Sequence, residues 1–435
     1  MNMSTPSKLA SAIALTFALA PGATIAGQLD YSLYGGVAHS DNINLTTHDP
    51  ISQTMLIPGV NFSYNQQGED LQANVIGDVE YRDYLGNRFR DQTQVELASQ
   101  LNWSVLPDRL DLAVQDYAGI QPLDTLASDA PGNQQQTNVF AVGPIYHFRL
   151  GSTVRGQAEL RYIDSYAEKT REFNSHRNQG ALRFAKILGP TSQLSLNATV
   201  QQVDFYNNTD SNYDRNELYV RYVSQLTFFD IDAALGESQI NYDRAGARTQ
   251  SSPLARATLS WRPTESSTFS ANVIRQYSDA AQDMMLMPGQ SPLANTTGIS
   301  TGDAVVSSEV YLERSLQLTY ALRTERVTFS ISPSYRKLGY GNDPTYDQTG
   351  RGGNIAIDYR LRPTMTLSAF ANGEQLKYHT LSRRDKTVTY GLELADQWTQ
   401  HWSWRAALTQ QRRTSNVPDQ GFHETLAYVG IVFKR

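Results

Sequence analysis

Charged side chains at alternate positions are the main chemical feature of this 435-residue sequence. Such rows can hydrogen-bond to a polar solute, and interleaved aromatic faces can stack against sugar rings. The alternative is that the charges form ion-pair ladders that only keep a wet wall rigid. The candidate pore-lining residues are Asp78, Glu80, Arg82, Glu96, Arg155, Glu159, Arg161, Glu217, Arg221, Arg256, Arg262, Glu313, Asp358, Arg360, Glu393 and Arg405.

Sequence signatures of catalysis and of metal binding are missing. The seven histidines are scattered with no H-x-x-x-H spacing, and the chain has no cysteine, so no metal site is expected. The sequence has no G-x-S-x-G elbow, no G-x-G-x-x-G after a strand and no P-loop. We therefore expect no enzyme activity and no cofactor.

Composition excludes several other classes. Charged residues make up 18% of the chain and hydrophobic residues 40%, which is typical of neither a disordered polyelectrolyte nor a disulfide scaffold. The net charge is −6, the pI is near 5.7, and no Lys/Arg cluster occurs. Nucleic acid is therefore not an expected partner, because phosphate binding needs a concentrated basic face.

The N-terminal segment has the pattern of a secretory signal. A single cation, Lys8, precedes an apolar stretch over 9–20, and small residues lead to Ala26. We predict cleavage after Ala26, which divides the chain into a signal peptide, 1–26, and one mature domain, 27–435.

Apolar and polar residues alternate through most of the mature chain, which is the period of a β-strand. In 71–82, Leu71, Val75 and Val79 lie on one face, while Asp78 and Glu80 lie on the other. Nine short turns imply about 20 strands. Longer polar segments, such as 40–53, 123–136 and 279–303, separate these hairpins.

Strict alternation of short turns and long loops is typical of bacterial outer-membrane barrels. Aromatic residues near the turns suit an interfacial girdle. We predict one antiparallel up-and-down transmembrane β-barrel of about 18–20 strands in a Gram-negative outer membrane, with both termini periplasmic. The predicted girdle residues are Trp103, Phe148, Phe228, Trp261, Tyr320, Tyr359, Trp398, Trp402 and Trp404.

The C-terminal residues Tyr428, Gly430 and Phe433 match most of the C-terminal pattern that outer-membrane barrels share for membrane insertion. This resemblance implies the barrel assembly machinery as a partner. Arg435 replaces the last apolar residue of that pattern.

The strand prolines Pro58, Pro144 and Pro333 cannot donate to a ladder, so we predict β-bulges there.

The segment 279–303 is unusually apolar for an exposed loop, since it contains Met284, Met285, Met287 and Pro288. Folded inward, these residues would form a plug or constriction. The alternative is a lid that packs on neighbouring loops.

The first hairpin resembles a bacterial family of outer-membrane β-barrels associated with exopolysaccharide biosynthesis and PEP-CTERM/exosortase systems. The likeness covers about the first sixty mature residues and is carried by Asp41, Asn42, Leu45, Pro58, Gly59, Phe62 and Tyr64. The resemblance implies a pore for a lipid-free polysaccharide that works with a periplasmic or inner-membrane export assembly.

From the resemblance, we expect a passive conduit for exopolysaccharide secretion, held in outer-membrane lipid. The same wall chemistry would serve a general or solute-specific porin for uptake. A surface hydrolase on a barrel scaffold is the third alternative, because outer-membrane hydrolases can place a Ser/His pair on a barrel wall.

Overall fold

Alternating side chains produce long antiparallel strands throughout the computed structural model, which describes residues 27–86, 88–286 and 304–435. The predicted signal peptide lies outside the described residues. The strands of the first half are β1 (Gln28–Ser40), β2 (Gln53–Gln67), β3 (Leu71–Tyr84), β4 (Gln92–Leu106), β5 (Leu110–Pro122), β6 (Gln134–Leu150), β7 (Val154–Ala167), β8 (Ser175–Gly189), β9 (Ser192–Phe205) and β10 (Tyr213–Gln225). Those of the second half are β11 (Phe229–Tyr242), β12 (Gln250–Thr264), β13 (Ser267–Ser278), β14 (Tyr311–Arg323), β15 (Val327–Tyr340), β16 (Gln348–Arg360), β17 (Met365–Tyr378), β18 (Arg383–Gln397), β19 (Trp402–Ser415) and β20 (Phe422–Lys434).

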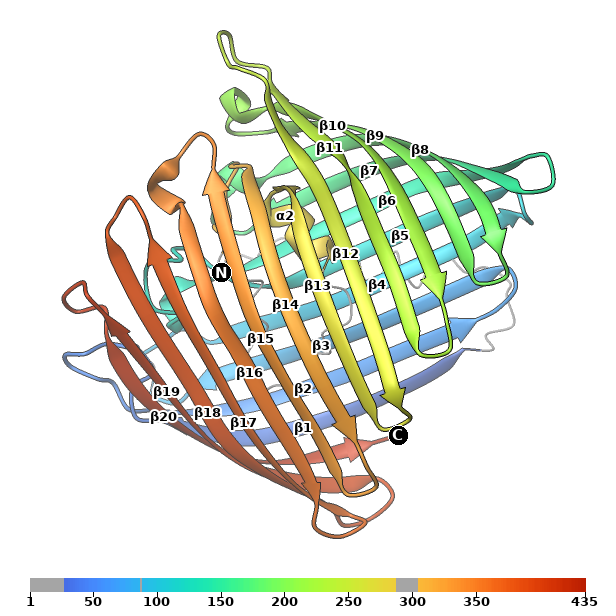
Figure 1. Ribbon diagram of the computed structural model, residues 1–435. Coiled ribbons are helices and arrows are strands. Elements are labelled where there is room, and N and C mark those ends of the chain that lie inside the picture. The colour runs from blue at the N-terminus through green and yellow to red at the C-terminus, as the bar shows by residue number, and fades with distance from the viewer. Residues whose placement is uncertain (1–26, 87, 287–303) are drawn as a thin grey trace, which may run out of the picture.

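Each strand pairs with its neighbours in sequence, and the last strand returns to the first (Figure 1). The closing register runs from Ser32 opposite Lys434 to Ser40 opposite Leu426. The prediction of a closed antiparallel barrel is confirmed, with 20 strands, at the upper end of the predicted range. Among the described residues, the helical elements are α2 (Ala280–Leu286) and the 3₁₀ turns η1 (Pro131–Asn133), η2 (Arg171–Phe173), η3 (Thr209–Ser211) and η5 (Pro344–Tyr346).

Connections differ between the two ends of the barrel, as the sequence predicts. One end carries short turns, such as 68–70, 190–191 and 265–266. Strand β1 begins and strand β20 finishes at this same end. The other end carries the longer loops, including 41–52 and 123–133, and helix α2, which follows β13. The loop 379–382 is an exception at that end, since it is as short as the turn 398–401.

The two faces of the sheet have opposite chemistry. Side chains two strands apart can touch only on the concave face, so the bond from Arg161 on β7 to Gln115 on β5 identifies the lumen side. Residues of the other parity include Leu160, Leu218 and Leu235, which are exposed. An outward apolar surface, a wet interior and sorted loops are features of an outer-membrane barrel. The short turns are therefore periplasmic and the longer loops extracellular.

A ladder of outward aromatic rings follows the periplasmic ends of β11 to β15. Phe229 stacks on Trp261 with centroids 5.9 Å apart, and Trp261 lies 5.3 Å from Phe269. Tyr320 continues the ladder, 4.6 Å from Phe269 and 6.2 Å from Phe329. Such rings suit the lipid headgroup region.

Within the described residues, no helix is both long enough and apolar enough to cross a membrane.

The prediction of β-bulges at the strand prolines is wrong. Pro58, Pro144 and Pro333 each interrupt the pairing with one neighbour, but the register on both sides of the gap is unchanged. Each proline stays in register with its other neighbour. A missing N–H donor therefore removes local ladder bonds without inserting a residue. The register shifts between the described strands lie beside periplasmic turns instead, for example between Trp261 and Thr264.

Candidate functional site

The candidate pore-lining residues occupy lumen-facing positions of their strands and are spread around the ring. Many are paired with a neighbour. Arg82 binds Glu80 at 2.6 Å, and Arg161 binds Glu159 at 2.5 Å. Other ion pairs of this set within the described residues are Arg256–Glu217, Arg215–Glu217, Arg262–Asp230, Arg221–Asp232 and Arg336–Glu313. These pairs hold the wall side chains in defined positions.

One cluster at mid-height joins the first and last strands. The Tyr34 hydroxyl donates to Asp78 at 3.0 Å and to Glu80 at 3.1 Å. The Arg405 guanidinium lies over two rings, 5.6 Å from the Tyr34 centroid and 4.8 Å from that of Tyr428. Carboxylates, a guanidinium and aromatic faces are the groups that bind a small solute bearing hydroxyl or charged groups.

The remaining residues of the predicted insertion signal lie on β20 beside the β1–β20 seam. Gly430 pairs with Gly36 on β1. A Cβ added to Gly36 would lie 2.5 Å from the Tyr428 ring. Phe433 faces outward and contacts Trp402 with centroids 5.1 Å apart. Tyr428 and Phe433 therefore pack on opposite faces of the same strand.

Helix α2 folds into the lumen at the extracellular end (Figure 1). Asp279 caps it by accepting from the backbone N–H groups of Ala281 at 3.0 Å and Gln282 at 3.1 Å. Its other carboxylate oxygen binds Arg177 at 2.7 Å and the Tyr213 hydroxyl at 2.8 Å. The side chains of Arg177 and Asp279 are 1% and 2% exposed, so this is a buried ion pair.

A second carboxylate fixes the helix to the neighbouring wall. Asp283 accepts from the Ser278 hydroxyl at 2.7 Å and from the Tyr311 hydroxyl at 2.6 Å. It also pairs with Arg336, whose Nε lies 3.1 Å from Glu313. The acidic side of α2 is thereby attached to strands β8, β10, β14 and β15.

The opposite side of α2 is apolar. Ala280 and Ala281 are buried in a cluster with Val139, Ile163 and Phe173 from the β6–β8 wall. Met284 and Met285 are partly buried against the same cluster. Two of the predicted plug residues therefore pack inside the barrel, while Met287 and Pro288 lie outside the described residues.

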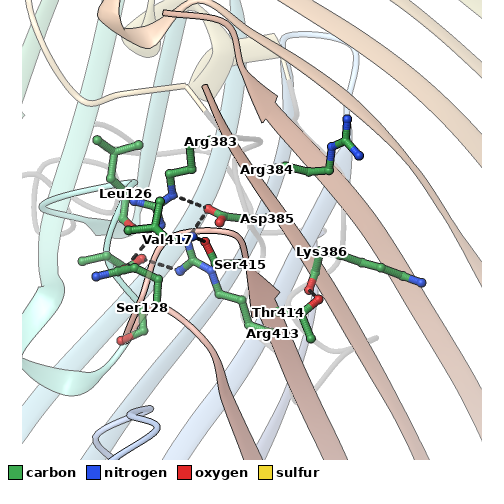
Figure 2. A network of polar contacts seen from close by, with 12 residues as sticks. Leu126, Ser128, Arg383, Arg384, Asp385, Lys386, Arg413, Thr414, Ser415 and Val417 are labelled. Atoms are coloured by element: carbon green, nitrogen blue, oxygen red, sulfur yellow. Dashed lines mark hydrogen bonds and ion pairs between the residues drawn. The ribbon is translucent and has the colours of Figure 1, made fainter. Parts of the chain in front are cut away.

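The β5–β6 loop crosses the lumen to the β18–β19 wall, as Figure 2 shows. Arg413 donates to the carbonyl of Ala127 at 2.9 Å and to that of Leu126 at 3.2 Å, and Arg383 also donates to Leu126. Asp385 lies between the two guanidinium groups, 2.8 Å from Arg383 and 2.6 Å from Arg413. All three of these side chains are buried.

The same loop is braced internally. The Asn133 amide donates to the carbonyls of Asp124 at 2.8 Å and Ser128 at 3.0 Å. Its side-chain oxygen accepts from the Asp124 backbone N–H at 2.9 Å. Together, α2 and the 123–133 loop enter the extracellular half of the lumen from two directions, and both are held by buried charge.

The extracellular rim holds a titratable contact between loops. Burial raises the pKa of the Glu309 carboxyl group above its ordinary value. A hydrogen bond with the Asn342 side chain and the positive charge of Arg244 lower this pKa, while the negative charges of Asp343 and Glu172 raise it further. These neighbours come from η2 and from the 243–249 and 341–347 loops. Protonation of Glu309 therefore stabilises the packed rim.

We expect the stability of the packed rim to depend on pH in one direction. Because the folded pKa is raised, the stabilisation is fully present below the ordinary glutamate pKa and is lost as pH rises through the raised value. The packed rim should therefore be more stable at about pH 4 than at about pH 8, which amide hydrogen exchange of 304–310, corrected for the intrinsic pH dependence of exchange, would measure. Glu309→Gln should remove this difference; if that variant keeps it, another group is responsible.

The residues that attach the inward segments could not be recognised from the sequence. Asp279 and Asp283 are four residues apart beside two alanines, which is a weak helical signal at the start of the predicted plug. Arg177, Arg383 and Arg413 sit in ordinary alternating strands, so nothing in their local sequence distinguishes them. Among the described residues, no group of three or more His, Cys, Asp or Glu side chains could hold a metal ion.

Comparison with known proteins gives similarity only in fold. No family model and no curated sequence matches the chain. A mutant of the ferric enterobactin receptor PfeA from Pseudomonas aeruginosa has a TM-score of 0.45 at 10% identity, covering 93% of this chain and 80% of that one. OccK2 from the same organism has a TM-score of 0.40 at 10% identity, covering 94% and 98%. The FrpB iron transporter of Neisseria meningitidis has a TM-score of 0.44 at 8% identity, covering 93% and 81%.

Proposed function

We propose that the protein is a passive channel that admits small polar solutes across the outer membrane, without catalysis. The observation that supports this proposal is the pair of inward segments, α2 and the 123–133 loop. A barrel of this strand number would otherwise leave a wide aqueous channel. Segments held by buried ion pairs narrow the path and limit the size of what passes.

The lumen chemistry agrees with this function. Its wall carries both signs of charge, and Tyr34 lies beside carboxylates and the Arg405 guanidinium. Groups of this kind form hydrogen bonds to the hydroxyl groups of sugars and to the charged groups of zwitterions. We infer that neutral or zwitterionic solutes pass more readily than solutes with a high net charge.

Export of a polysaccharide is the second candidate, favoured by the resemblance of the first hairpin. The residues that carry the resemblance have structural contacts. Asn42 is buried and donates to the carbonyls of Thr46 and His423, both at 2.8 Å. An added Cβ on Gly59 would meet the Tyr34 ring at 2.2 Å. The bond to His423 ties the first extracellular loop to β20, and the Gly59–Tyr34 contact packs β2 against β1, so both contacts serve the barrel whatever passes through the lumen.

Permeation of solutes of graded size separates the two candidates. Purified protein in liposomes should admit monosaccharides and disaccharides in a swelling assay and exclude long oligosaccharides. In parallel, a deletion strain should secrete normal amounts of exopolysaccharide. Passage of long oligosaccharides, together with loss of secreted polysaccharide and its accumulation in the periplasm, would establish export and overturn the uptake proposal.

A further inference from the structure

The outward face of β13 to β19 carries a group of cations near the extracellular end. These side chains lie at outward positions, opposite in parity to the lumen residues Glu313, Arg336 and Asp385. We call this set the basic arc. It consists of Arg275, Arg314, Lys337, Arg351, Lys377, Arg384, Lys386 and Arg412.

Most of the arc lies at one height. Counted from the extracellular end, the fourth residue of each strand from β13 to β19 is a cation, except on β17, where it is Gln375. These cations are Arg275, Arg314, Lys337, Arg351, Lys386 and Arg412. Register pairs Arg275 with Arg314, and Arg314 with Lys337, so like charges stand next to each other. Adjacent like charges across a sheet are unfavourable unless an anion compensates them.

No compensating acid is present on this surface. Outward positions in the extracellular half of these strands contain no Asp or Glu. In the part of the chain that the structure describes, no ion pair involves a residue of the arc. Arg275 donates to the carbonyl of Pro253 at 3.2 Å, and Arg351 lies 5.9 Å from the Tyr335 ring. Figure 2 shows Arg384 and Lys386 directed away from the buried Asp385 contact.

The other side of the barrel has different chemistry at the same height. The matching outward positions on β8 to β11 are Asn178, Gln202, Asn216 and Gln239, all uncharged amides. Carboxylates such as Asp164, Asp204 and Asp214 also face outward on that side. The concentration of positive charge is therefore confined to one sector of the circumference.

The arc marks the outer edge of the apolar surface. On β14, Leu316 and Leu318 are the outward residues between Arg314 and Tyr320. On β16, Ile355 and Ile357 lie between Arg351 and Tyr359. At about 3.3 Å per residue, these intervals run about 20 to 26 Å along the strands. Because barrel strands are tilted by about 40°, this corresponds to about 15 to 20 Å of height, which is most of the apolar band of about 25 Å in an outer-membrane barrel. The cations are thus at the height of the outer-leaflet headgroups.

We propose that the basic arc binds the phosphate groups of a phosphorylated glycolipid, lipopolysaccharide, in the outer leaflet. Guanidinium and ammonium groups spaced along neighbouring strands match several phosphates on one headgroup, and the apolar strand surface below them accommodates the acyl chains. The proposal depends on the membrane placement of the barrel and not on which solute passes through the lumen.

A matched pair of triple variants tests the proposal. The first carries Arg314→Gln, Arg351→Gln and Lys386→Gln, which remove three exposed cations of the arc. The control carries Arg109→Gln, Arg326→Gln and Arg362→Gln, which remove the same charge at exposed periplasmic positions. Binding of lipopolysaccharide in detergent, measured at low salt, should weaken about 100-fold in the first variant, since each cation contributes about fivefold. The control should bind as the unmodified protein does.

Comparison ligands identify the chemistry. Dephosphorylated glycolipid should bind weakly to the unmodified protein, and inorganic phosphate at the same concentration should not displace the lipid. The single-channel conductance of the first variant should be unchanged, which also shows that it folds. Equal weakening in both variants, equal binding of the dephosphorylated lipid, or displacement by inorganic phosphate would each overturn the proposal.

Discussion

Replacing Asp279 with Ala is expected to release α2 from the wall and raise single-channel conductance. The substitution leaves the buried Arg177 guanidinium without its partner, and breaking a buried pair in this way costs about 3 to 5 kcal/mol. It also removes the helix cap, at about 1 kcal/mol. The strands themselves keep their ladder bonds, so the barrel should remain folded. Conductance in planar bilayers is the direct measurement.

The matched control for this experiment is Asp358→Ala. Asp358 is also a lumen carboxylate, but it is exposed, accepts a hydrogen bond from the Ser368 hydroxyl at 2.6 Å and attaches no inward segment. Its conductance should stay close to that of the unmodified protein. Equal conductance for Asp279→Ala and the unmodified protein would mean that α2 does not restrict the path.

The double substitution Arg383→Gln and Arg413→Gln is expected to free the 123–133 loop from the β18–β19 wall. The two guanidinium groups supply the bonds to the Leu126 and Ala127 carbonyls, and Asp385 is left buried without a cation. Uncompensated burial of this charge costs about 3 to 5 kcal/mol. Conductance should rise independently of the effect at Asp279.

Labelling gives a second readout for this loop. The chain contains no cysteine, so Ser128→Cys introduces a unique thiol. A maleimide too large for the narrowed lumen should react with it faster in the double variant than in the parent. Arg88→Gln with Arg90→Gln removes equal charge from the 85–91 loop and should not change the labelling rate. Equal rates in all three proteins would show that the arginines do not hold the loop.

Much of the fold could be predicted because a barrel strand repeats a local rule. In 71–82, each residue's face follows from parity alone, and β3 places Asp78 and Glu80 on the lumen side as that parity requires. The local structure at the strand prolines could not be predicted in the same way. Proline in a sheet is expected at an edge or a bulge, and this expectation does not include a long strand pair that loses two residues of pairing and keeps its register. Pro333 is such a case, because the pairing of β15 with β14 skips from Ser334 opposite Gln317 to Ile331 opposite Tyr320.

The lumen contacts could not be predicted from local pattern. Arg177 and Asp279 are 102 residues apart in sequence, and Arg413 and Ala127 are 286 apart. These contacts depend on the position of each strand in the closed barrel and on which loops fold into the lumen. The segment beginning at Asp279 was distinguished by its methionines, but the 123–133 loop has no comparable feature.

Closure by β1 and β20 also sets the order in which the molecule can be completed. The strand that covers the edge of the first hairpin is the last one in the chain, so this pairing has nearly the largest sequence separation available. Contacts of such separation form slowly, because the closure entropy of the intervening chain must be overcome first. Until the last strand pairs, β1 presents an open edge that can add a foreign strand. The newly exported chain is therefore most prone to aggregate in the interval before its C-terminal residues arrive.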